Sequence, residues 1–201
     1  MMSEWILKKH LYMDALLDFE DVGHDPSCSR CKAPDYGLFR CFTCLGCGNY
    51  CQSCIVYMHS LMPLHRIMYW DQSAGCFLNT SLASLGLVLN IGHKDERCPH
   101  ALLGDLRSVT VVHTNGIHEV QVRFSMCTHS HSPDLQLFAF RLFPSTVNSP
   151  QTAFSFEVLQ QFHFYHLEGK GSVYTFMNAI ERLTDDTGYQ NVQVQTNILY
   201  F

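Results

Sequence analysis

The sequence has little charge and few basic residues in particular. Charged residues make up 15% of the 201, and 13 lysines and arginines stand against 18 acidic residues, for a formal net charge of −5. Such a chain lacks the overall basic character that drives non-specific binding to nucleic acids. Any contact with DNA would therefore have to be local or shared with a partner.

The sequence also has no long apolar run and no secretory start. Its longest apolar stretch, residues 82–91, contains Ser84, Gly86 and Asn90 and falls short of the roughly 20 residues that a membrane helix needs. The start, MMSEWILKKH, has no apolar core ahead of a small-residue cleavage site. We expect a soluble intracellular protein with reduced thiols, no membrane contact and no small-molecule substrate.

Cysteine and histidine are plentiful by contrast. The chain has 10 cysteines and 12 histidines. Three Cys-x2-Cys pairs and a His-x5-His pair supply eight side chains: Cys28, Cys31, Cys41, Cys44, Cys51, Cys54, His59 and His65. Eight such ligands suit two tetrahedral zinc ions, because two pairs fill all positions around each ion. A disulfide framework, the alternative, would have no use for the histidines.

The spacing alone leaves open which pairs share an ion. In a linear arrangement the first two cysteine pairs hold one zinc, and the third pair and the histidines hold the other. The order of the pairs, with the histidines last, resembles the B-box, whose pairs interleave. That resemblance implies one ion on the first and third cysteine pairs and one on the second cysteine pair and the histidines, which is the arrangement we prefer. Cys47 also has ligand spacing from Cys44, but we interpret it as a spare thiol in a glycine-flanked turn.

Hydrophobic periodicity predicts an α+β fold. In this fold a small B-box-like cross-brace zinc module precedes a β-hairpin or short sheet and C-terminal helices. We divide the chain into an N-terminal amphipathic helix (1–25), the cysteine cluster (26–71), a small β-rich domain (72–145) and a helical segment (146–201).

The first expected elements are a helix over 4–19 that docks on the protein's own body and a short helix running into a strand over 81–91. A hairpin of strands 109–113 and 117–124 around Asn115-Gly116 follows, and then a central strand over 135–143. The last elements are a helix from 154 and a helix from 173 with Ser172 as its N-cap and Gly188 as its stop.

Several landmarks stand in a fixed order along residues 4–189. They are SEWILKKHLYMDALLDFE, the cysteine cluster, PLHRIMYW, LASLGLVLNIGHKDERCP, VVHTNGIHEVQVRF, QLFAFRLFPSTVNSPQTAFSFEVLQQFHF and AIERLTDDTG. This series resembles the CxC-like cysteine-cluster domain that precedes the catalytic region of KDZ transposases, a family abundant in fungi. The resemblance implies a zinc-binding cluster, with catalysis left to a downstream ribonuclease-H-like domain that uses metal-binding carboxylates.

The chain stops where that catalytic domain would begin, so we expect no enzymatic activity. We interpret it as a truncated or domesticated, transposon-derived accessory protein. Its expected partners are transposon-end DNA, a separately encoded transposase or another protein, and the resemblance adds the nucleus as its expected location. The alternative is a B-box-like protein-interaction module unrelated to transposition.

A third metal site is a further alternative, built from His93, Cys98 and Cys127 with His118, His129 or His131 as the fourth ligand. Alternation places His118 on the strand face opposite to Cys127. Family members carry a Cys-x-Cys at the end of the hairpin strand, whereas this chain has Ser125-Met126-Cys127 there. Because one cysteine is lost, we favour thiols and loop histidines without metal.

Overall fold

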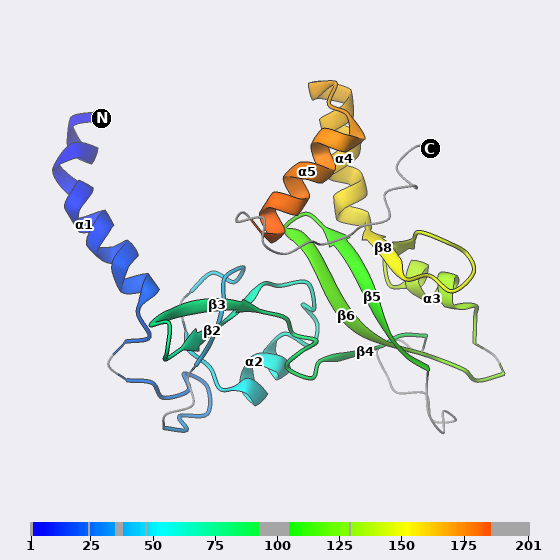
Figure 1. Cartoon of the computed structure of the whole chain (residues 1–201), viewed down its shortest axis with the longest axis horizontal. Helices are drawn as coiled ribbons and strands as arrows, with labels where there is room; N and C mark the ends of the chain where they lie inside the picture. Colours follow the sequence, from blue (N-terminus) through cyan, green and yellow to red (C-terminus); the bar gives the residue numbers. More distant parts are fainter. Residues whose placement is uncertain are drawn as a thin grey trace. The chain divides into compact units, whose positions relative to one another are not determined.

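The computed structural model of the chain describes residues 2–23, 25–34, 38–46, 48–92, 105–128 and 130–185 (Figure 1). Its helices and strands follow in chain order: α1 (Met2–Glu20), β1 (Phe39–Cys41), α2 (Gln52–Met58), β2 (Ile67–Asp71), β3 (Cys76–Thr80), β4 (Val88–Asn90), β5 (Asp105–His113), β6 (Gly116–Phe124), α3 (Pro133–Ala139), β7 (Leu142–Pro144), β8 (Thr152–Ser155), α4 (Phe156–Gly169) and α5 (Val173–Thr184).

These elements form two compact units, residues 1–86 and 87–201. Each unit has its own sheet, and the first also carries the cysteine-rich cluster, so the expected α+β class with a cysteine cluster ahead of a sheet and C-terminal helices is confirmed. The four-segment division of the chain stays a prediction. Among the described residues, no helix is long and apolar enough to cross a membrane.

The first unit is built on an antiparallel sheet of order β1-β2-β3. Arg40 of β1 ties this sheet to the end of α1. Its guanidinium lies 4.2 Å from the centre of the Phe77 ring and donates hydrogen bonds to the Asn49 side-chain oxygen, to the Phe19 carbonyl oxygen and, at 3.0 Å, to the Asp21 carbonyl oxygen. The cation is therefore used inside the unit, where it stacks on an aromatic ring and satisfies backbone oxygens.

The helix α1 forms where the sequence predicts one, but its side chains are not buried. Every side chain from Glu4 to Glu20 is exposed. The expectation that this helix docks on the protein's own body is therefore wrong for the described residues. Apolar periodicity predicts a helix, but it does not say whether a second surface covers the apolar side chains.

The second unit contains a mixed sheet of order β4-β6-β5-β8-β7. The hairpin of β5 and β6 is confirmed, and its register pairs Val112 with Ile117 and His113 with Gly116. Strand β4 pairs parallel to β6 and β8 pairs parallel to β5, so the hairpin lies at the centre. Its β-branched residues explain this place, because central strands are buried on both faces.

Helices α4 and α5 pack on one face of this sheet. The buried cluster joins side chains of the sheet to those of the two helices: Val112, Ile117, Phe154, Val158, Phe176, Met177 and Ile180. The α5 helix begins at the predicted N-cap, where the Ser172 hydroxyl oxygen accepts a hydrogen bond from the Thr175 backbone N–H. The predicted stop at Gly188 lies outside the described residues, and the helix ends at Thr184.

The prediction of a central strand over residues 135–143 is wrong. This stretch is the helix α3 followed by a left-handed residue, Arg141 (φ 61°), and the short strand β7. Strand β7 pairs with β8 alone and lies at the edge of the sheet. A continuous apolar run is compatible with either a strand or a buried helix, so periodicity could not separate them. The residues Ser132-Pro133-Asp134 before the run have the composition of a helix start.

Two smaller expectations are partly correct. The stretch 81–91 ends in a strand as predicted, β4, but a turn over residues 82–86 precedes it in place of a short helix. Phe154, read as part of a helix, belongs to β8, and α4 starts two residues later. Ser155 is the N-cap of α4, with its hydroxyl oxygen accepting from the Val158 N–H at 3.2 Å.

Candidate metal centre

The first and third cysteine pairs come together in the first ligand group. The thiols of Cys28, Cys31, Cys51 and Cys54 all have ligand atoms within 4.8 Å of one another. Three of them are buried, and Cys31 is exposed. Cys31 and Cys51, from different pairs, have sulfur atoms 3.8 Å apart. The combination is the interleaved one.

The second cysteine pair and the two histidines form the second ligand group, and the same 4.8 Å limit holds for Cys41, Cys44, His59 and His65. Cys44 Sγ lies 3.4 Å from both His59 Nε2 and His65 Nδ1, and Cys41 Sγ lies 3.5 Å from His65 Nδ1. His59 Nδ1 lies 2.8 Å from the Ile55 carbonyl oxygen. That carbonyl can only accept, so Nδ1 carries the proton and Nε2 presents its lone pair to the thiols.

These distances are the edges of zinc-sized tetrahedra. With Zn–S of about 2.3 Å and Zn–N of about 2.0–2.1 Å, a regular tetrahedron has S···S edges of roughly 3.8 Å and S···N edges of roughly 3.5 Å. The sulfur–sulfur distance of 3.8 Å and the sulfur–nitrogen distances of 3.4–3.5 Å fit both values. The two groups could therefore hold one metal ion each, the first with four sulfur ligands and the second with two sulfur and two nitrogen ligands.

The strand β1 and the helix α2 bring these ligands together. Phe39 at the start of β1 exchanges backbone hydrogen bonds of 2.8 and 2.9 Å with Tyr50. The strand that ends at Cys41 and the segment that leads to Cys51 therefore lie side by side. Cys51 is the N-cap residue of α2, and His59 is its C-cap residue. About one helical turn therefore separates Cys51 from Cys54 in the first group. His59, at the far end of the same helix, is a ligand of the second group.

The thiols of the first group differ in their readiness to ionise. Burial raises the pKa of Cys28, but backbone N–H groups of Cys31, Cys51 and Arg30 outweigh it and lower the pKa to about 6. The neighbouring thiol of Cys51, together with burial, raises the pKa of Cys54 to about 11. Crowded thiols cannot all ionise by themselves, and a bound divalent cation reverses this, because it stabilises every coordinating thiolate.

In the second group, burial raises the pKa of Cys44, and the hydrogen bond with His59 offsets part of this shift. Two thiolates and two neutral imidazoles would balance a divalent ion, whereas four thiolates leave an excess of two negative charges. A cation lies beside the four-thiol group: Arg30 Nη1 is 3.8 Å from Cys54 Sγ, and the guanidinium stacks 4.2 Å from the centre of the Tyr57 ring. Nothing in the spacing of the sequence indicates this role for Arg30.

The residues weighed for a third site are only partly described. His93, Cys98 and His129 lie outside the described residues, and so does Cys47, the thiol interpreted as spare in the cysteine cluster. Cys127 Sγ lies 3.4 Å from the Ser125 hydroxyl, and His118 Nε2 lies 2.7 Å from the Asn115 side-chain oxygen. Within the described part of the chain, the two groups above are the only metal-ligand clusters.

A buried glutamine, Gln136, holds the loop after β6. The Gln136 side-chain oxygen accepts from the Ser125 N–H at 2.9 Å, and its side-chain N–H group donates to the carbonyl oxygens of Ser125 and His131 at 3.0 and 2.6 Å. Sequence reasoning missed Gln136, since nothing in its spacing sets it apart from a surface residue of a strand. Its amide ties the loop after β6 to α3.

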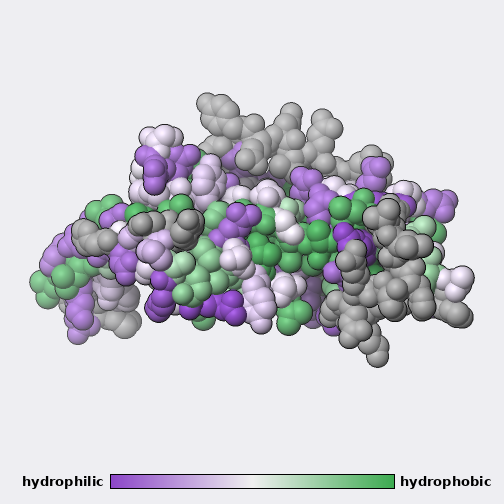
Figure 2. Space-filling view, turned by 90° about the horizontal axis from the view of Figure 1, so that it is seen from below, coloured by the Kyte–Doolittle hydropathy of each residue, from purple (hydrophilic) through white to green (hydrophobic). Residues whose placement is uncertain are grey.

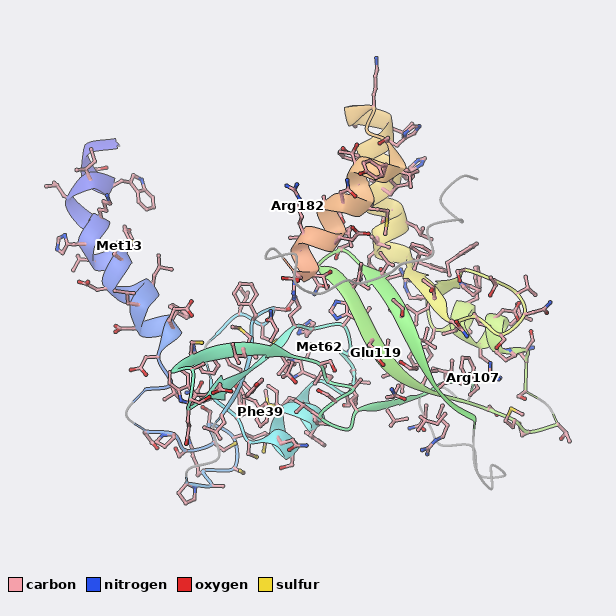
Figure 3. The ribbon with its side chains drawn as sticks, in the orientation of Figure 1. Met13, Phe39, Met62, Arg107, Glu119 and Arg182 are labelled. Carbon is pink, nitrogen blue, oxygen red and sulfur yellow. The ribbon has the colours of Figure 1, made fainter. Side chains whose placement is uncertain are left out.

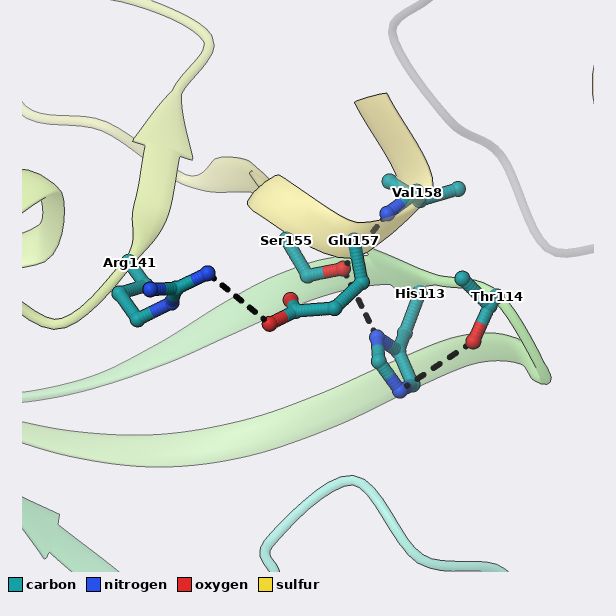
Figure 4. Close-up of polar contacts among 6 residues, drawn as sticks. All are labelled: His113, Thr114, Arg141, Ser155, Glu157 and Val158. Carbon is teal, nitrogen blue, oxygen red and sulfur yellow. Dashed lines mark hydrogen bonds and ion pairs between the residues drawn. The ribbon is translucent and has the colours of Figure 1, made fainter. Parts of the chain in front are cut away.

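A serine–histidine pair at the start of α4 also escaped sequence reasoning (Figure 4). His113 Nδ1 lies 2.8 Å from the Ser155 hydroxyl, and Glu157 pairs with Arg141 at 3.5 Å. Ser155 is 1% exposed and its oxygen caps α4, so a substrate cannot reach it. Burial lowers the pKa of His113, and the Glu157 carboxylate opposes this shift only in part. The pair of a half-buried histidine and a buried serine is a structural contact between the sheet and the helix.

Comparison with known protein families identifies the second unit. The family model described as "CxC2 like cysteine cluster associated with KDZ transposases" matches residues 82–188, so the chain belongs to this family. No curated protein and no solved structure matches the chain. The matched stretch covers the mixed sheet and α3 to α5, whereas both ligand groups, between Cys28 and His65, precede it.

Proposed function

We propose that this chain is a non-catalytic recognition protein of the KDZ transposase system, and that two structural zinc ions hold its first unit together. Membership of the CxC2 family supports the link to transposition. The observation that carries the metal part is the joining of eight cysteine and histidine side chains into two groups with tetrahedral zinc dimensions. The transposon-derived role is favoured over an unrelated B-box-like module because of the family membership.

The ligand sets support a structural role for the ions. Catalytic zinc sites use three protein ligands and leave one position open for water or substrate. Each group here offers four protein ligands, and cysteines of the first group are largely buried. Zinc would supply a cross-link between β1, α2 and the loops around them, in a unit with a small sheet of its own.

The surface around the second ligand group favours a protein partner over DNA. Phe42, Leu45 and Leu61 each stand within two residues of a ligand of this group, and all three are strongly exposed. Arg40, next to the ligand Cys41, and Arg30, beside the first ligand group, both stack on aromatic rings of the unit. Exposed apolar side chains of this kind are typical of protein interaction sites.

The affinity of the full chain for a KDZ transposase protein, measured by surface plasmon resonance, tests this function. We expect Leu45→Ser with Leu61→Ser to weaken binding about tenfold or more, since each leucine contributes buried apolar area. Leu167→Ser with Leu183→Ser is the control, because both are exposed leucines, at 56% and 51%, on α4 and α5 of the other unit.

A gel-shift series with element-end and random DNA duplexes tests the alternative that the partner is transposon-end DNA. Preference for the element ends, with an affinity that falls steeply with salt, would replace the protein partner by DNA. Binding to neither the transposase nor element-end DNA would contradict the recognition function.

We place the protein in the nucleus, where the DNA substrate of a transposase lies.

A further inference from the structure

The first ligand group, made of four thiols, differs from the second in the charge that it would carry. Four thiolates around a divalent ion leave an excess of about two negative charges. The second group has no such excess, because two of its four ligands are histidines, which bind as neutral imidazoles. Three of the four thiols are buried away from water. Donors and cations beside the sulfur atoms therefore decide how firmly the first group can hold an ion.

Three of the four thiols have neutral donors or water beside them. Backbone N–H groups, that of Arg30 among them, make hydrogen bonds to the Cys28 sulfur. The Ser53 hydroxyl lies 3.3 Å from the Cys51 sulfur and can donate to it once the thiol is ionised. Cys31 is exposed, so water can solvate its sulfur. The fourth thiol, that of Cys54, has a different kind of neighbour.

The Arg30 side chain reaches Cys54 from the loop between the first two cysteines. Its Nη1 lies 3.8 Å from Cys54 Sγ, and Cys54 is only 5% exposed. The guanidinium also lies 4.2 Å from the centre of the Tyr57 ring. Cys54 and Tyr57 are three residues apart on α2, so the sulfur and the ring lie on the same side of the helix. Figure 3 shows the side chains of this unit as sticks, with sulfur in yellow. The ring therefore holds the cation beside the buried sulfur.

We propose that Arg30 is a positioning residue of the first ligand group, where its guanidinium compensates the thiolate charge at Cys54 and sets how tightly the group holds its ion. Tyr57 acts through Arg30, because it orients the guanidinium and touches no ligand charge itself. Partners of metal ligands typically change metal affinity by about 10–100-fold. The assignment rests on the metal part of the proposed function, and it makes the two ligand groups unequal in their dependence on one arginine.

Metal binding resolved by site tests this assignment. Cadmium NMR of the full, cadmium-loaded chain separates a site of four sulfur ligands from a site of two sulfur and two nitrogen ligands, since sulfur shifts the cadmium resonance further than nitrogen does. Titration with a chelator then gives the affinity of each site within one protein. We expect Arg30→Met to weaken cadmium binding at the first group about tenfold or more and to leave the second group unchanged. The methionine keeps the backbone N–H beside Cys28 and removes only the charged donor.

Two further variants separate the contact from charge in general. Lys32→Met is the matched control, because Lys32 is an exposed cation two residues further along the same loop and loses the same charge. Figure 2 shows hydrophilic side chains spread over the first unit, at the left of the view, and among such surface groups one charge is screened by water. We expect a change of less than about twofold for Lys32→Met. Arg30→Lys keeps the charge but loses the planar fork, so it should recover part of the affinity. Equal effects of Arg30→Met and Lys32→Met would overturn the proposal.

Tyr57→Leu tests whether the ring acts through the cation. Alone it is expected to weaken the first group less than Arg30→Met does, and added to Arg30→Met it should have no further effect. A further loss in the double variant would contradict the positioning by the ring. Loss of both groups in Arg30→Met would indicate unfolding and would overturn the assignment, as would unchanged affinities. An unchanged chain that binds no metal would instead overturn the metal part of the proposed function together with this inference.

Discussion

The two ligand groups depend on atoms that carry no ligand role themselves. The Ile55 carbonyl oxygen fixes the proton of His59 on Nδ1, and the Arg30 guanidinium lies beside the four-thiol group. The cysteine and histidine spacing predicts the ligand types, and resemblance to the B-box suggests the interleaved pairing. Neither could predict Arg30 or Ile55, because their roles depend on how α2 packs against the loop after Cys28.

Loss of one ligand is expected to unfold the first unit. Structural zinc contributes about 10–16 kcal/mol of binding free energy in small domains, which is as large as the whole stability of about 5–15 kcal/mol of a typical domain. Cys41→Ser is therefore expected to abolish the thermal unfolding transition of this unit in calorimetry. Cys76→Ser is the control, because the half-buried Cys76 belongs to neither ligand group. A Cys41→Ser protein that melts as the unchanged chain does would contradict the structural role of the metal.

His113 makes stability depend on pH. Burial lowers its pKa in the folded state below the ordinary value of about 6.5. The unfolded chain therefore binds a proton that the folded chain does not, and the stability that neutral His113 contributes is fully present above about pH 6.5 and is lost as the pH falls toward the folded pKa. Urea unfolding between about pH 5 and 8 measures this. In His113→Gln the decline toward low pH should be smaller, and equal slopes in both proteins would show that His113 is not its source.

Local sequence signals predict elements well where caps and periodicity agree. The hairpin around Asn115-Gly116 and the Ser172 cap of α5 follow from such signals. The stretch 135–143 does not, because α3 has only seven residues and two of its central side chains, Gln136 and Leu137, are buried. A polar residue buried by hydrogen bonds to a loop leaves no hydrophobic pattern to detect.

The two serine caps give a graded test of helix capping. Ser172→Ala removes the bond from the Thr175 N–H and is expected to cost about 1 kcal/mol. Ser155→Ala removes the cap of α4 and also the partner of His113, so we expect about 2–3 kcal/mol. Chemical denaturation of both variants measures the difference. Equal losses would mean that the contact with His113 adds nothing to the cap.

The molecule consists of two units with different sources of stability. The first unit, residues 1–86, contains both ligand groups. The second unit, residues 87–201, contains the buried hydrophobic cluster between the sheet and the helices α4 and α5. The family model matches the second unit almost alone. The division could not be read from the sequence, because apolar residues continue without a linker through Leu87.

Chelation should act on one unit only. Removal of metal is expected to abolish hydrogen-exchange protection in β1, α2, β2 and β3, because the first unit needs its cross-links. Strands β5 and β6 should remain protected, since hydrophobic packing stabilises them. Peptide-resolved hydrogen exchange with and without a zinc chelator measures both. Uniform loss of protection in the two units would contradict their separate stabilisation.

The zinc content of the purified, reduced protein tests the account most directly. Native mass spectrometry gives the number of ions bound per folded chain, and elemental analysis identifies the metal. The two ligand groups predict two zinc ions for each chain. A folded, reduced protein that binds no metal would contradict the structural account of the first unit and, with it, the metal-dependent part of the proposed function.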